Sequence, residues 1–150
     1  HVFSGLPVGH ASVSPQGRTD YELYTTQLTT LDAYAESHLS GQVNFIKCDV
    51  EGSELMVLRG ARRILQQPVP PIWIMEMAKG TASYFGHLPN DLLELMRQYG
   101  DYEFFAIDEI RNRLIPKRVF EKEDIGANVL CISSKHHLDR LRILRGMIED

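Results

Sequence analysis

The sequence predicts an α/β domain built on a mostly parallel sheet with helices on both faces. Short apolar runs typical of buried strands alternate along the chain with segments whose apolar residues recur at helical spacing. Such alternation is typical of parallel sheets, because each helix carries the chain back across the sheet to start the next strand. At 150 residues, the chain has the length of a single domain.

The first 22 residues are expected to form an irregular loop, since glycines and prolines are scattered among serines there. The α/β region would then extend over residues 23–150, starting with a short extended stretch at 23–28. Thr30 is a suitable helix N-cap, and Asp32 falls in the first turn, where the helix dipole favours a negative charge. The sequence therefore predicts a helix from residue 31 that ends before Gly41.

Residues 43–48 form a compact apolar run, which predicts a strand covered on both faces. From Ser53 the apolar period becomes helical, and the pattern continues to residue 65, before Pro68. The second buried strand is expected at 72–76. The next helix should begin at Pro89 and stop at Gly100.

The C-terminal third is expected to contribute the remaining strands and a last helix. Residues 102–107 predict a third strand, and residues 114–120 and 128–133 predict two more, which would form an antiparallel hairpin or edge. A helix is predicted over residues 135–148, where leucines recur on one side.

Composition excludes several classes of function. The formal net charge is −4, and no basic stripe is visible, which argues against a nucleic-acid-binding surface. No apolar run approaches the roughly 20 residues that a membrane span needs. Cys48 and Cys131 each lie within an apolar, strand-like run, so we expect buried, inert thiols in a reducing, cytoplasmic compartment.

Three acidic residues lie where strands give way to polar sequence, and we call Asp49, Glu51 and Glu76 the carboxylate rim. In parallel sheets, ligands bind beyond the carboxyl ends of the strands. Neighbouring carboxylates repel, so this rim calls for a positive charge: a divalent metal ion bound by all three, Lys47, or a cationic sulfonium. Alternatively, Asp49, Glu51 and Glu54 merely favour the positive N-terminus of the helix that follows.

Other candidates are weaker. His87 follows the second strand on the expected ligand side, where it would act as a base or bind substrate. Tyr84 and Phe85 in the same loop would wall an acceptor pocket, or simply pack. His136 and His137 are expected at a solvated helix end, since adjacent side chains diverge on a helix and make a poor metal pair.

A family resemblance covers residues 25–135. FIKCDVEGSELMVLRGARRIL, at 45–65, resembles the signature of the FkbM family of methyltransferases, with an apolar strand, D-x-E-G and a helix containing V-L-x-G-A. The T-L-D segment at 30–32, the strand at 71–76 that ends in glutamate, and the late strand at 128–132 also match. The resemblance implies a Rossmann-like class I methyltransferase fold, S-adenosylmethionine as donor, and a hydroxyl as acceptor.

One departure from the family pattern bears on fold and activity. Such enzymes hold the donor mainly through a Gly-rich turn after their first strand and an acid after their second, and neither is recognisable in this sequence. No cofactor-binding residue is therefore assigned. The resemblance implies that the first N-terminal strands of the sheet are missing, which would expose an apolar edge of the 43–50 strand and favour homo-oligomers or aggregation. It leaves open whether the 150 residues are active alone.

We therefore expect methyl transfer to a hydroxyl of a small molecule or sugar. Asp49 would act as general base or metal ligand, Glu51 and Glu76 would orient the acceptor or hold a cation, and Lys47 would tune Asp49. Two alternatives stay open: a metal-dependent hydrolase on an α/β sheet, and a non-catalytic interaction fragment. A nicotinamide-dependent dehydrogenase is disfavoured, because no G-x-G-x-x-G follows a strand.

Overall fold

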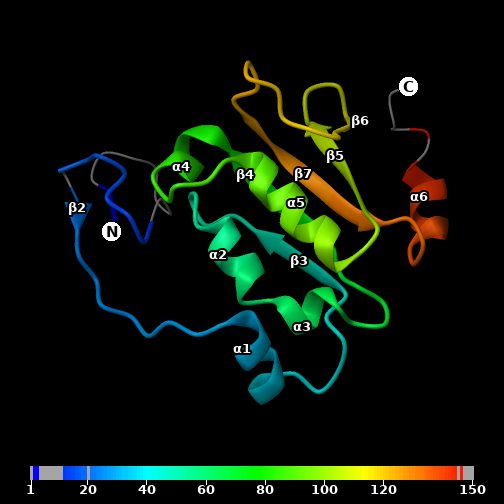
Figure 1. Cartoon of the computed structure of the whole chain (residues 1–150), viewed down its shortest axis with the longest axis horizontal. Helices are drawn as coiled ribbons and strands as arrows, with labels where there is room; N and C mark the ends of the chain where they lie inside the picture. The colour runs from blue at the N-terminus through cyan, green and yellow to red at the C-terminus, as the bar shows by residue number, and fades with distance from the viewer. Residues whose placement is uncertain (1, 4–11, 20, 145, 147–150) are drawn as a thin grey trace.

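The computed structural model describes residues 2–3, 12–19, 21–144 and 146 (Figure 1). Its strands and helices follow in chain order: β1 (Val2–Phe3), β2 (Tyr21–Glu22), α1 (Leu31–His38), β3 (Phe45–Cys48), α2 (Glu54–Arg59), α3 (Arg62–Leu65), β4 (Ile72–Ala78), α4 (Lys79–Ser83), α5 (Pro89–Tyr99), β5 (Tyr102–Asp108), β6 (Arg113–Pro116), β7 (Gly126–Ser133) and α6 (Leu138–Leu144).

The main sheet has five strands in the order β3-β4-β7-β5-β6. Strands β3 and β4 are parallel, whereas the pairings of β7 with β4, of β7 with β5 and of β5 with β6 are antiparallel. The α/β class is confirmed, but the expectation of a mostly parallel sheet is wrong for the part described. Hydrophobic periodicity reveals that a strand is buried, not its direction, so it could not show that β7 runs between β4 and β5.

The two faces of the sheet bury separate apolar clusters, as the period of two along a strand requires. On β4, Trp73 and Met75 face the larger cluster, which includes residues of α2, α3 and α5. Ile72 faces the smaller cluster on the other side, together with Leu141 of α6. Figure 1 shows α2, α3 and α5 packed in front of the sheet. Helices therefore contribute to the cores on both faces, as expected.

The helix predicted over residues 53–65 is broken at Gly60 and Ala61 into α2 and α3. Asp32 explains the break. Its two carboxylate oxygens accept hydrogen bonds from the backbone N–H groups of Arg63, at 3.0 Å, and Ile64, at 3.1 Å. Its own N–H donates to the Gly60 carbonyl oxygen at 2.9 Å. Asp32 thus caps α3, a long-range role that a residue-by-residue analysis of α1 misses.

Helix α1 begins as expected, with the Thr30 hydroxyl accepting from the Ala33 N–H at 3.1 Å.

Strand β3 differs from the expectation of a strand covered on both faces. Among the described residues it pairs only with β4, and the Phe45 side chain is 54% exposed. The stretch at 23–28, expected to be extended, belongs to no helix or strand, and β2 just before it pairs with β1.

The C-terminal strands follow the expectation in part. Strand β6 pairs antiparallel with β5 at the edge of the sheet, as expected, whereas β7 lies inside the sheet and forms no hairpin with β6. Helix α6 runs from Leu138 to Leu144, so it begins three residues later than predicted, and residues 145, 147 and 148 of the predicted helix lie outside the described residues. Within the described part of the chain, no helix combines the length and the apolar character that crossing a bilayer requires.

Candidate functional site

The carboxylate rim is assembled by β3 and β4, the one parallel pair among the described strands. Cys48 of β3 lies opposite Met75 of β4, and Asp49 and Glu76 come one residue further along each strand. Asp49 follows the end of β3, whereas β4 continues past Glu76 to Ala78, so the strand end expected at Glu76 is wrong: pairing with β7 extends the strand by two residues. Glu51 follows Asp49 by two residues and acts electrostatically on Glu76. The structure therefore brings together the three carboxylates that the sequence singled out.

Glu76 has an unusual environment within this group. Burial, and after it the negative charges of Asp49, Glu51 and Glu54, raises the pKa of its carboxyl to about 6, while Lys47 acts in the opposite direction. Its Oε2 atom is buried and makes no hydrogen bond to the described residues. A partly buried carboxylate with a pKa of about 6 holds and releases a proton near neutral pH, which is the property of a general base.

Lys47 lies beside Asp49, as the sequence predicted. Its Nζ atom donates a hydrogen bond to Asp49 Oδ2 over 2.6 Å, and this bond raises the pKa of the lysine. Both side chains are largely exposed, so the ion pair contributes little to stability. The ion pair matters locally, because it places the Lys47 ammonium at the rim. This ammonium is bound to Asp49 and not to Oε2 of Glu76.

The turn that follows β3, residues 49–52, is held in a demanding conformation. Glu51 has φ of 55° and Gly52 has φ of 99°. A Cβ atom at position 52 would lie 2.4 Å from the carbonyl oxygen of Thr81, so only glycine allows the turn to pack this closely against α4. This D-x-E-G turn therefore has a structural reason for its glycine, besides any chemistry.

Residues that the sequence did not single out fix this turn. The carbonyl oxygen of Glu51 accepts hydrogen bonds from Gln16 Nε2 at 2.9 Å and Ser12 Oγ at 3.4 Å. Ser12 is buried, although it belongs to the stretch expected to be an irregular loop. No periodicity marks these contacts, because they join residues more than thirty positions apart through single side chains. Glu54, treated above only as a charge at a helix start, also bonds the turn.

His87 lies in the interior rather than in an open cleft. It is 7% exposed, and neither ring nitrogen has a hydrogen-bond partner among the described residues. Burial lowers the pKa of its imidazole below the usual range. A role for His87 as a base stays a prediction. In the same loop region, Tyr84 is largely exposed, and the Phe85 ring lies against Gly52.

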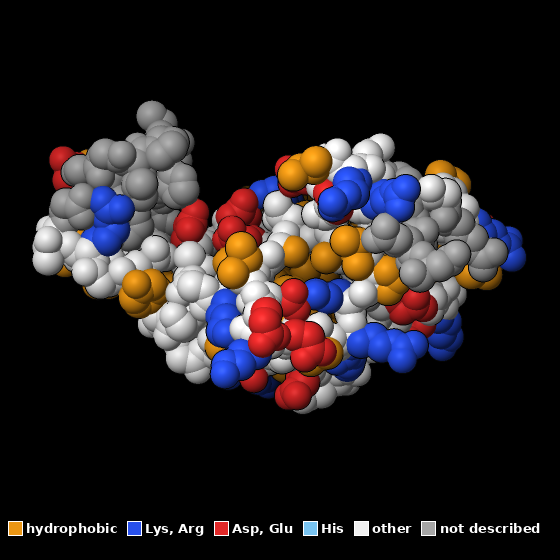
Figure 2. All heavy atoms as spheres, turned by 90° about the horizontal axis from the view of Figure 1, so that it is seen from above, with side chains coloured by type: hydrophobic (Ala, Val, Ile, Leu, Met, Phe, Trp, Pro, Cys, Tyr) orange, Lys and Arg blue, Asp and Glu red, His pale blue; other side chains and the backbone are white. Residues whose placement is uncertain are grey.

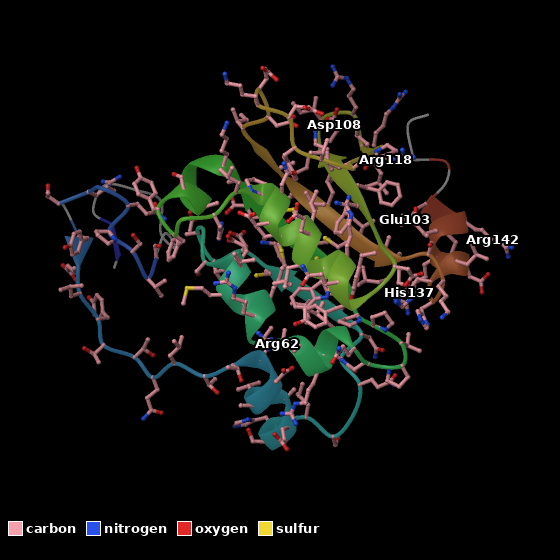
Figure 3. The ribbon with its side chains drawn as sticks, viewed as in Figure 1. Arg62, Glu103, Asp108, Arg118, His137 and Arg142 are labelled. Carbon is pink, nitrogen blue, oxygen red and sulfur yellow. The ribbon has the colours of Figure 1, made fainter. Side chains whose placement is uncertain are left out.

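The histidine pair near the C-terminus is only half as expected. His137 is buried, and its Nε2 lies 2.8 Å from the carbonyl oxygen of Pro70, so it is not a solvated helix end. Figure 3 shows His137 beside the start of α6, at the end of the molecule opposite α4. The pair is thus remote from the candidate site.

Two further expectations concern thiols and metals. Cys48 and Cys131 are both buried and free, and burial raises the pKa of Cys48 to about 12, which keeps this thiol protonated and inert, as predicted.

Across residues 12–19 and 21–144, no group of three or more His, Cys, Asp or Glu side chains is arranged to hold a metal ion. The divalent metal considered from sequence therefore gains no support.

A groove of about 860 Å³ runs beside β3, between it, α2 and the segment leading into α1. Its lining is mostly apolar and includes Ile46, Val50, Met56 and Val57. Elsewhere, on the face seen from above in Figure 2, acidic and basic side chains are interspersed around hydrophobic ones rather than segregated by sign.

The comparisons with known proteins agree with this geometry. The family model of the methyltransferase FkbM domain matches residues 4–103, two-thirds of the chain, and the match includes the D-x-E-G turn and Glu76. No curated protein and no solved structure gives a significant match. With a parallel β3–β4 pair that presents the rim, and a family model that covers most of the chain, this protein belongs to the FkbM methyltransferase domain family.

Proposed function

We propose that the chain serves methyl transfer from S-adenosylmethionine to a hydroxyl group of a small molecule or sugar. The family membership supports methyl transfer. The observation that carries the proposal for the acceptor is the half-buried Glu76 carboxylate, with its pKa of about 6 and an oxygen that has no partner among the described residues. A hydroxyl is the nucleophile that needs such a proton acceptor.

The negative charge of the rim complements the positive charge of the methyl donor. S-adenosylmethionine supplies, when bound, a methyl group activated on a sulfonium cation. The carboxylates of Asp49, Glu51 and Glu76 gather negative charge at one place, and a cation nearby relieves their repulsion. Among the described strands none leads into a Gly-rich turn, so we assign no residue to the nucleotide part of the donor.

Within this proposal, Glu76 is better suited than Asp49 to be the base, which revises the assignment favoured from sequence. Asp49 Oδ2 already accepts the Lys47 ammonium at 2.6 Å. The buried Oε2 of Glu76 has no hydrogen-bond partner among the described residues, and in this proposal it takes the proton of the acceptor hydroxyl as the oxygen attacks. Asp49 and Glu51 then orient the acceptor or balance charge, and Lys47 fixes Asp49.

The test is transfer of labelled methyl groups to a panel of sugars and small alcohols by the protein from its native source. Replacing Glu76 by Gln should lower the rate by roughly 10²–10⁴-fold, the contribution of a general base. Because a base must be deprotonated, the wild-type rate should fall as pH drops through about 6. Asp49→Asn should also lower turnover while leaving the fold intact.

Glu94→Gln is the matched control, since Glu94 is exposed on α5 outside the rim. An unchanged rate in Glu76→Gln would remove this residue from the chemistry. A protein that neither binds S-adenosylhomocysteine nor transfers methyl groups would favour the non-catalytic alternative.

A further inference from the structure

Glu54 is a buried carboxylate with an unusual set of partners. Its side chain, at the first position of α2, is 2% exposed. Its Oε1 atom accepts hydrogen bonds from the backbone N–H groups of Val50, at 3.1 Å, and Gly52, at 3.2 Å. Burying a carboxylate is costly unless it is hydrogen-bonded. The two amides therefore stabilise the buried Glu54 carboxylate, and the carboxylate in turn fixes the positions of the two amides.

The two amides flank the residue whose backbone is hardest to hold. Val50 precedes Glu51 and Gly52 follows it, and Glu51 itself occupies the left-handed region that non-glycine residues disfavour. The Ser53 hydroxyl closes the same turn by donating to the Val50 carbonyl oxygen at 2.9 Å. Glu54 thus reaches back across the turn and fixes the peptide groups on either side of Glu51.

From this geometry we infer that Glu54 is a positioning residue for the carboxylate rim, setting the D-x-E-G turn so that Asp49 and Glu51 face Glu76. The inference rests on the function proposed above, because it assigns Glu54 to the same site. Glu54 is buried beneath the turn and acts through the turn, not on a substrate. Its carboxylate therefore has a task beyond favouring the N-terminus of α2.

Charge gives this role a second, separable consequence. Four charged groups influence Glu76: the carboxylates of Asp49, Glu51 and Glu54 and, in the opposite sense, the Lys47 ammonium. The residue opposite Glu76 on β7, Asn128, is neutral. Removing the Glu54 charge should therefore lower the pKa of Glu76, which a side chain that served only as packing would not do.

Two variants separate position from charge. Glu54→Gln keeps an acceptor oxygen but removes the charge, so the Glu76 titration midpoint, followed by carbon NMR of its carboxyl, should fall. Glu54→Asp keeps the charge but withdraws the oxygen by one methylene. The amides of Val50 and Gly52 should then exchange their hydrogens about tenfold faster, because each loses a charge-assisted bond. In Glu54→Asp the Glu76 midpoint should move less than in Glu54→Gln.

Glu94→Gln again serves as control, and thermal melting establishes that each variant is folded. Amide exchange and a Glu76 midpoint that match this control in both variants would overturn the inference. In the methyl-transfer assay, Glu54→Asp should lower kcat more than it raises KM for the donor. Absence of transfer by the wild-type protein would refute the proposed function alone, since the NMR measurements on Glu54 do not depend on activity.

Discussion

At the scale of single residues, the polar groups in the interior carry the most information. Glu54 is satisfied by two backbone amides, whereas the ring nitrogens of His87 have no partner among the described residues. A buried polar group without a partner costs stability, and the cost grows when the group must also carry charge. His87 should therefore make the fold sensitive to acid.

The direction of this pH dependence of stability follows from proton linkage. Burial lowers the pKa of His87 in the folded protein, so below pH 6.5, the usual histidine value, the unfolded chain binds a proton that the folded chain resists. Stability is retained above that pH and declines as the pH falls below it. Arg59 also lowers the pKa, while Asp91 and Glu54 partly offset it.

We predict that His87→Leu flattens the decline of melting temperature between pH 7.5 and pH 5.5, since leucine has no proton to gain. Scanning calorimetry across this range measures it. His136→Gln, at an exposed histidine, should melt with the wild-type pH dependence. An equally steep decline in His87→Leu would show that other groups cause the acid sensitivity.

At the scale of elements, the joint between α2 and α3 shows how one side chain sets a boundary. Asp32 from α1 caps α3 with both carboxylate oxygens, and Gly60 at the break lies against Thr30. Replacing Asp32 by Ala leaves two N–H groups at the start of α3 without their acceptor. We expect a loss of about 1–2 kcal/mol in the free energy of unfolding, measured by urea titration.

Asp139→Ala supplies the comparison, because Asp139 lies in the first turn of α6 and bonds only the exposed Arg142 among the described contacts. The free energy of unfolding of Asp139→Ala should differ from that of the wild type by no more than about 0.5 kcal/mol. If Asp32→Ala were equally mild, Asp32 would not be what holds α3.

The sequence predicted most elements for physical reasons that are local. Thr30 caps α1, Pro89 opens α5, and the apolar runs of β3, β4 and β5 form strands where expected. The rim was found because Asp49 follows β3 directly and Glu76 comes one register position later on the parallel strand β4, although β4 continues to Ala78 beyond the end that the sequence indicated. Local patterns could not reveal the Asp32 cap, the Gln16 and Ser12 contacts, or the central place of β7, since each joins distant segments.

At the scale of the whole molecule, the free side of β3 is the feature with the broadest consequence. Among the described residues β3 pairs only with β4, Phe45 projects largely into solvent, and a mostly apolar groove runs alongside. Such an edge is a template for pairing with another chain. We propose that the 150-residue chain associates with itself through this edge.

Light scattering coupled to size-exclusion chromatography should show a mass that grows with concentration, and Phe45→Lys should reduce it, because a charged side chain disfavours edge pairing. Ile110→Lys replaces an even more exposed apolar residue, in the β5–β6 connection, and should leave association unchanged. A clean monomer with cooperative melting at every concentration would contradict the proposal.

The central claim is that the carboxylate rim of this FkbM-family chain serves methyl transfer. The most direct measurement compares wild-type protein from its native source with its Glu76→Gln variant, following labelled methyl groups from S-adenosylmethionine to hydroxyl acceptors across pH 5–8. The account predicts transfer by the wild type that declines as pH falls through about 6, and its near loss in the variant at an unchanged melting temperature. Transfer that is equal in the two proteins, or absent from the wild type, would contradict it.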